Sequence, residues 1–116
     1  MSISDIFYTE SCILYKSAHT EPDKRGYVKT TYEPISDDVA CSVTPINTAK
    51  SREKWGIHST ATCEITFDLN IDVDVKQISA IEYRGELYLV ENYEIYPAFM
   101  ILSESVVFAV RLDTNG

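Results

Sequence analysis

The stretch Ala61-Thr62-Cys63-Glu64-Ile65-Thr66-Phe67-Asp68-Leu69 decides the fold class of this chain. Apolar side chains at 63, 65, 67 and 69 alternate with polar ones at 62, 64, 66 and 68. Such alternation has the period of two residues that is typical of a strand with one buried face. The stretch therefore predicts a β-strand that belongs to a sheet covering a core.

Strand patterns continue on both sides of this stretch. The segments expected to form strands are 11–16, 27–32, 39–44, 71–75, 81–83, 86–90 and 105–112. Arg84-Gly85 separates two of them, and a two-residue connection with glycine second predicts a tight β-hairpin. No segment has a convincing long helical pattern, so we expect an all-β protein.

A chain of 116 residues fits one domain with one modest core, here spanning 1–116. We expect the N-terminal segment 1–10 to contain one short helical turn, with Ser4 as its N-cap. Pro45 ends a strand, and 44–57 is then expected to form a long polar and basic loop between strands. Closing a sheet removes its exposed edges, so we predict a small closed or partly open β-barrel of about six strands.

The net charge of −8 is unevenly distributed along the chain. Residues 1–58 carry a net charge of −1, whereas residues 59–116 carry ten acids and three bases, a net charge of −7. Sequence-independent binding of nucleic acid depends on lysine and arginine at phosphates, so this balance disfavours a DNA- or RNA-gripping module. There is no apolar run of the length of a membrane span and no signal-peptide pattern at the N-terminus, so we expect a cytoplasmic place of synthesis and assembly.

The sequence contains no catalytic constellation that residue patterns can identify. The four glycines are too scattered for a phosphate-binding loop, and no serine-nucleophile or zinc-protease motif occurs. A nucleophile pair of Cys63 and His58 would rest only on their proximity in sequence. The odd set of Cys12, Cys41 and Cys63 fits buried apolar side chains in strands. We therefore expect no catalytic residues, no metal and no cofactor.

The segment 68–74 resembles a calcium-binding loop because side-chain oxygens occur at every second residue. The sixth position, however, is Val73 where glycine is needed, and the twelfth is Ser79 where a bidentate glutamate is needed. An acidic outer face of a strand produces the same spacing. We interpret the segment as a solvated strand face or a turn, and we expect Asp68, Asp72 and Asp74 to form an acidic surface.

The segment 50–55 concentrates three of the ten basic residues of the chain beside its one tryptophan. It forms either a single helical turn or a mobile loop. One interpretation is a solvated segment with the tryptophan packed against the barrel. The other is a contact with a neighbouring subunit, another protein or passing DNA. The candidate interface residues are Lys50, Arg52, Glu53, Lys54 and Trp55.

Two motifs and the order of the elements carry a resemblance to a known family. The first is Val39-Ala40-Cys41-Ser42-Val43-Thr44-Pro45, and the second is Ile81-Glu82-Tyr83-Arg84-Gly85-Glu86-Leu87-Tyr88-Leu89-Val90. Over residues 8–112 the chain resembles the head-completion (stopper) proteins of long-tailed bacteriophages, also called head–tail joining or head-closure proteins. Family members often have Gly-Asp shortly before the hairpin, where this chain has Val75-Lys76-Gln77. The resemblance therefore does not decide to which subfamily of neck or minor capsid proteins the chain belongs.

The resemblance implies a structural virion assembly protein in the neck, between head and tail, that is not an enzyme. It implies binding below the portal or its adaptor after DNA packaging, closure of the DNA channel and a docking surface for the tail or tail terminator. It also implies a homo-oligomeric ring in the virion, leaves open a monomer in solution, and directs 44–57 toward the channel. We expect at most non-specific contact with packaged DNA, no contact with membranes, and assembly in the cytoplasm of a bacterial host.

Other functions fit parts of the sequence. A tail terminator or another minor capsid or neck component would share the same features. An OB-like nucleic-acid-binding module could use the eight tyrosines for base stacking, but the acidic second half lacks the basic groove of such modules. A small hydrolase or metal-dependent enzyme is the weakest alternative, because no residue pattern indicates one.

Overall fold

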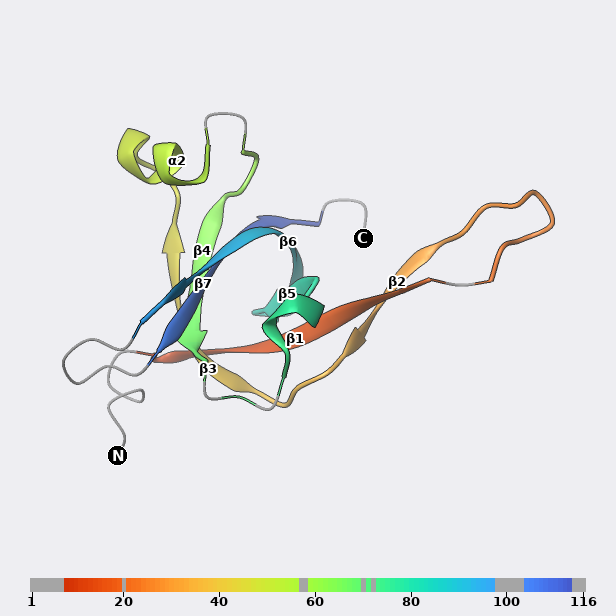
Figure 1. Ribbon diagram of the computed structural model, residues 1–116, viewed down its shortest axis with the longest axis horizontal. Coiled ribbons are helices and arrows are strands. Elements are labelled where there is room, and N and C mark those ends of the chain that lie inside the picture. Colours follow the sequence, from red (N-terminus) through yellow and green to blue (C-terminus); the bar gives the residue numbers. More distant parts are fainter. Residues whose placement is uncertain are drawn as a thin grey trace.

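A computed structural model describes residues 8–19, 21–56, 59–69, 71, 73–97 and 104–113 of the chain. Strands dominate these ranges, together with a short α-helix and a 3₁₀-helix (Figure 1). In chain order the elements are β1 (Glu10–His19), β2 (Thr30–Pro34), β3 (Val39–Pro45), α2 (Ala49–Trp55), β4 (Cys63–Asp68), η1 (Val75–Gln77), β5 (Ala80–Tyr83), β6 (Glu86–Tyr96) and β7 (Ser105–Leu112).

Six strands form a closed antiparallel barrel in the order β1-β3-β4-β7-β6-β5. The barrel closes where β5 returns to β1, with Ile13 opposite Glu82 and Tyr15 opposite Ala80. The seventh strand, β2, pairs with the second half of β1 outside this ring. The prediction of an all-β barrel of about six strands is thereby confirmed.

The core fills the interior of the barrel. In β4 the residues Cys63, Ile65 and Phe67 are buried while their neighbours are half-exposed, as the alternation predicted. The rings of Phe67 and Phe108 stack with their centroids 5.5 Å apart at the centre. The buried side chains of this cluster are Cys12, Leu14, Cys41, Cys63, Ile65, Phe67, Ile78, Ile81, Val106, Phe108 and Val110.

The expected tight hairpin joins β5 to β6. Arg84 has φ 53° and Gly85 has φ 79°, so both central residues of the turn are left-handed. This conformation matches the twist of the two flanking strands and is the reason for glycine at the second position. Beyond the hairpin, β6 has a bulge between Val90 and Asn92 and extends to Tyr96, farther than the sequence pattern indicated.

The expected strand at 71–75 is wrong. The chain bends there and enters η1, whose first turn Asp74 caps by accepting a hydrogen bond from the backbone N–H of Lys76 at 3.0 Å. Ile71, Val73 and Val75 are half-buried and pack against the core cluster. Their alternation therefore comes from a connection that covers the core rather than from pairing in the sheet.

Two other expectations change at the start of the chain. β2 begins at Thr30 rather than at 27, because its register is set by pairing with β1, in which His19 lies opposite Thr30 and Tyr15 opposite Pro34. The predicted N-terminal helical turn falls largely on residues 1–7, which lie outside the described residues. Its last residue, Glu10, is already part of β1.

Tyrosine–carboxylate pairs connect β1 to β5 near the closure of the barrel. The hydroxyl of Tyr15 donates to Glu82, and the hydroxyl of Tyr83 donates to Glu10. Arg84 also reaches Glu10 at 3.1 Å. The hydrogen bond to Glu10 raises the pKa of Tyr83 to about 12, because it stabilises the neutral phenol.

Removing the central ring should destabilise the whole barrel. Phe108→Ala should lower the free energy of unfolding by about 3–5 kcal/mol, because it leaves a cavity beside Phe67. Urea unfolding followed by circular dichroism measures this loss. Val28→Ala, at a position 50% exposed, is the control and should change the free energy by less than about 0.5 kcal/mol. Equal losses for the two variants would contradict the core described above.

The Tyr83–Glu10 pair should weaken at alkaline pH. The pKa of Tyr83 is raised from 10.0 in the unfolded chain to about 12 in the fold, so its stabilisation is complete below pH 10 and is lost as pH rises to 12. The free energy of unfolding should therefore fall more steeply over this interval in the natural protein than in Tyr83→Phe. Parallel curves for the two proteins would refute the pairing.

Candidate functional site: the outer surface around α2

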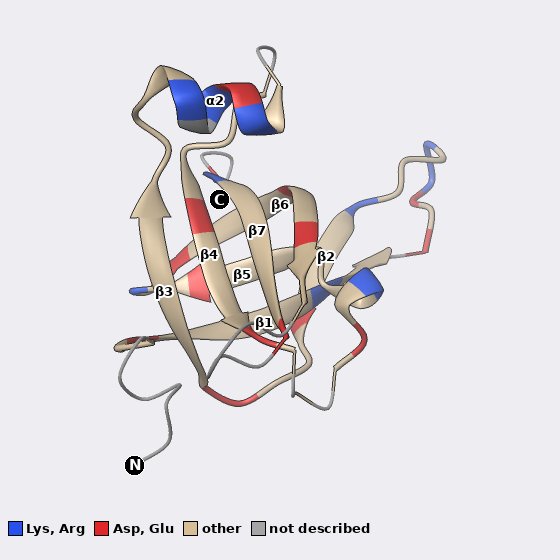
Figure 2. Ribbon diagram, turned by 60° about the vertical axis from the view of Figure 1, so that its left-hand side comes forward, with Lys and Arg blue, Asp and Glu red and all other residues tan. Residues whose placement is uncertain are grey.

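The segment 44–57, expected as a loop, contains α2, which lies beyond the ends of β3 and β4 at one end of the barrel (Figures 1 and 2). Residue 57 lies outside the described residues. Ile46 is buried and forms a second small cluster with Ala61 and Ala109, which Trp55 covers from the helix. Gly56, at φ 102°, ends the helix in a conformation that other residues rarely adopt. The tryptophan therefore packs against the barrel, as the first interpretation expected, and the contact with a neighbouring subunit, another protein or DNA stays a prediction.

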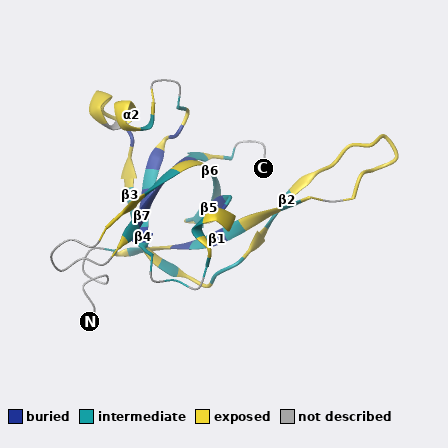
Figure 3. Ribbon diagram, viewed as in Figure 1, coloured by how far each residue is buried: buried dark blue, intermediate teal, exposed yellow. Residues whose placement is uncertain are grey.

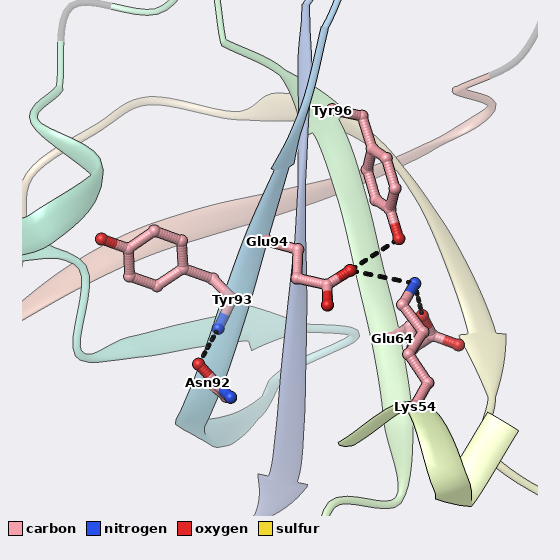
Figure 4. Close-up of polar contacts among 6 residues, drawn as sticks. All are labelled: Lys54, Glu64, Asn92, Tyr93, Glu94 and Tyr96. Carbon is pink, nitrogen blue, oxygen red and sulfur yellow. Dashed lines mark hydrogen bonds and ion pairs between the residues drawn. The ribbon is translucent and has the colours of Figure 1, made fainter.

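Lys54 holds α2 to the barrel through two aromatic rings and two carboxylates. Its Nζ lies 5.0 Å from the ring centroid of Trp55 and 4.9 Å from that of Tyr96. The same atom lies 3.4 Å from Glu64 on β4 and 3.6 Å from Glu94 on β6 (Figure 4). We call these five residues the Lys54 cluster.

The electrostatics of the Lys54 cluster favour the charged amine. Partial burial lowers the pKa of Lys54, but contacts with Tyr96 and Glu64 outweigh this effect and leave the pKa raised. Tyr96 also donates to Glu94 at 2.8 Å, so the carboxylate accepts from both neighbours. Because Lys54 is committed to these partners, it is not an open contact for DNA phosphates in this arrangement.

The remaining interface candidates point outward. Lys50, Arg52 and Glu53 are exposed on α2, and the basic residues form a conspicuous band on the helix in Figure 2. Of the five candidates, the structure therefore separates two that anchor the helix from three that face solvent.

The acidic candidates do not form one strand face. Asp68 is half-buried at the end of β4 near Tyr8, whose pKa is raised by burial and by the charge of Asp68. Asp74 is exposed and caps η1, whereas Asp72 lies outside the described residues. Because β4 ends at Asp68 and the chain then bends, the segment is a turn rather than a strand face, and the acidic surface stays a prediction.

The three cysteines are buried, as their positions in strands predicted. A hydrogen bond with Cys41 and burial raise the pKa of the Cys12 thiol. Over the described parts of the chain, no group of three cysteine, histidine or acidic side chains is placed to hold a metal ion. The three cysteine side chains pack as apolar groups in the core cluster.

An open cleft of about 500 Å³ lies at one end of the barrel. Apolar side chains, one hydroxyl and two carboxylates line it, namely Ile35, Ser36, Asp37, Asp38, Val39, Ile71 and Val73. The hydroxyl of Ser36 accepts a hydrogen bond from the backbone N–H of Leu14 at 2.9 Å, and the lining includes no cation. The cleft is the edge of the core where the connection between β4 and η1 covers it.

Sequence reasoning missed Glu64, Glu94 and Tyr96 as partners of Lys54. Glu64 and Glu94 lie 10 and 40 positions away from it along the chain, so no local spacing could indicate the contact. The one available signal was the excess of acids after residue 58 beside a basic segment before it. That signal predicts attraction between the two halves without naming the pairs.

None of the helices in the described ranges has the length and apolar character needed to cross a membrane. In the comparisons with known proteins, no family model and no curated sequence matches this chain. The function must therefore be argued from the geometry described above together with the family resemblance in the sequence.

Lys54→Ala should release α2 from the barrel. The variant loses two cation–aromatic contacts and two exposed ion pairs, so we expect a loss of about 1–2 kcal/mol in the free energy of unfolding. Trp55 is the only tryptophan, and its fluorescence should shift to longer wavelength and become more accessible to acrylamide. Lys50→Ala on the exposed side of the same helix is the matched control. An unchanged emission spectrum in Lys54→Ala would show that other contacts hold the helix.

Proposed function

We propose that this protein is a structural assembly protein of the bacteriophage neck. It binds as a ring below the portal or its adaptor after DNA packaging, closes the DNA channel and offers a docking surface to the tail. It is assembled in the host cytoplasm, becomes part of the virion and performs no catalysis. The proposal rests on the family resemblance over residues 8–112, and the geometry supports it in three respects.

The first support, and the one that carries most weight, is the presence of exposed bases on α2 in an otherwise acidic molecule. Lys50 and Arg52 are exposed on α2, at one end of a molecule whose residues 59–116 carry a net charge of −7. An acidic surface repels DNA phosphates, so a duplex can pass it without being held. The basic face of α2 is then the part of the surface that attracts a DNA end or an acidic neighbour.

The second support is mechanical. Sixteen apolar side chains are buried among the described residues, and the ring of six strands is closed by backbone pairing. Closed barrels have no open edge within the ring and keep their shape when loaded from outside. Such a unit suits a wall around a channel under pressure.

The third support concerns the five tyrosines of β1, β5 and β6, each of which is engaged within the barrel. Tyr15 and Tyr83 donate to carboxylates, while Tyr88 and Tyr93 pack against the core. Tyr96 belongs to the Lys54 cluster. This arrangement disfavours the OB-like alternative, in which several exposed rings would line one basic groove.

The structure also modifies how the channel would be closed. A mobile loop at 44–57 would enter the channel by itself, whereas α2 is held against the barrel by Lys54. We propose that the exposed face of α2, with Lys50 and Arg52, meets the DNA end or locks to the adjacent subunit.

The test uses DNA-filled heads of the phage that encodes the protein, prepared without it. Adding the natural protein should protect the packaged DNA from nuclease and allow tails to join. The double variant Lys50→Glu/Arg52→Glu should protect at least about tenfold less, because it reverses the charge that faces the DNA or the neighbour. Lys76→Glu, an exposed base on η1, is the control and should protect normally.

Heads that keep their DNA and accept tails without the protein would refute the proposal. Binding to free tail ends instead of heads would identify a tail terminator, the alternative station in the same particle.

A further inference from the structure

The connection between β1 and β2 projects far from the barrel (Figure 1). We call residues 17–19 and 21–32 the arm. The molecule measures 55 × 33 × 24 Å, and the arm extends along the longest of these dimensions. Its base is a two-stranded ribbon in which Ser17 lies opposite Tyr32 and His19 opposite Thr30. All residues from 21 to 30 are exposed (Figure 3).

The tip of the arm is a built turn. Asp23 accepts hydrogen bonds from the backbone N–H groups of Arg25 at 2.8 Å and Tyr27 at 3.0 Å. The N–H of Asp23 donates to the carbonyl of Tyr27 at 3.0 Å, and Gly26 provides the left-handed residue at φ 82°. These bonds hold Tyr27 and Val28 in a defined position although nothing in the described chain covers them.

Two pairs of exposed apolar side chains lie at opposite ends of the molecule. Tyr27 is 71% exposed and Val28 50% exposed at the arm tip, whereas Ile95 is 54% and Tyr96 37% exposed at the end of β6. The end of β6 lies across the barrel from the arm in Figure 1. A two-stranded ribbon is marginally stable in water, so its exposed apolar tip gains most from being covered.

The charges of the two ends are complementary. Lys24 and Arg25 stand in the turn before Tyr27, where Asp23 is used by hydrogen bonds within the turn. The exposed Glu104 lies just before β7, beside the end of β6, where Glu94 is already paired with Lys54. Both ends belong to the same chain, so a second copy supplies the matching surface without another partner.

We propose that the arm of one copy docks on the end of β6 of the next copy. Tyr27 and Val28 cover Ile95 and Tyr96, and Lys24 and Arg25 approach Glu104. The two surfaces differ, so the contact is head-to-tail, which produces a ring when the rotation closes. The inference deepens the ring of the proposed function and rests on it in that respect.

The test measures self-association by sedimentation and light scattering at up to about 1 mM protein, where even a millimolar contact is populated. The mass of the natural protein should rise above the monomer value of 13.1 kDa and fall again as salt screens the charges. Tyr27→Ser/Val28→Ser lacks the arm tip and Ile95→Ser lacks the receiving surface, so each should associate at least about tenfold more weakly. Leu112→Ser, at another exposed apolar position, should associate normally.

Mixing the two variants tests the head-to-tail geometry. The arm-tip variant keeps a receiving surface and Ile95→Ser keeps an arm, so the mixture should form complexes of two chains that grow no further. A natural protein that stays monomeric, an arm-tip variant that associates normally, or a mixture that stays monomeric would each overturn the arm contact. DNA retention by heads judges the neck function separately: if the natural protein protects heads but shows no arm contact, the contact is overturned and the neck function stands.

Discussion

The fold depends on the pairing of β1 with three other strands. Its first residues pair with β3, its middle pairs with β5 to close the barrel, and its last residues pair with β2 outside the ring. Closure brings Ile13 and Leu14 beside residues more than 65 positions later in the chain, which encloses the core from that side. The same strand continues past the barrel and becomes the base of the arm. The barrel and the arm thus share one continuous strand, β1.

The Lys54 cluster determines what the outer surface presents. A single lysine lies between two rings and two carboxylates contributed by α2, β4 and β6. Individually such exposed contacts are weak, but together they hold a seven-residue helix that would be marginal alone. The result is a fixed helix whose outward side carries Lys50 and Arg52. The segment expected as a basic loop is therefore a helix in a defined position, with Lys50 and Arg52 on its exposed side.

The long axis of the molecule has two chemically different ends. The arm tip combines apolar side chains with bases, and the end of β6 combines apolar side chains with acids. Differences of this kind favour repeated contacts in one direction over symmetric pairs.

The sequence by itself determined the class of fold and its most local features. Alternation in 63–69 and 105–112 and the Arg84-Gly85 turn required only neighbouring residues, because side-chain direction in a strand and the φ angles of a turn are local properties. Only the tertiary structure decided the closure of β1 on β5, the docking of α2 through Lys54 and the fate of Ile71 and Val73. An apolar pattern states which side chains avoid water but not which surface covers them. A connection lying over the core and a strand in the sheet satisfy that requirement equally, and long-range packing chose between them.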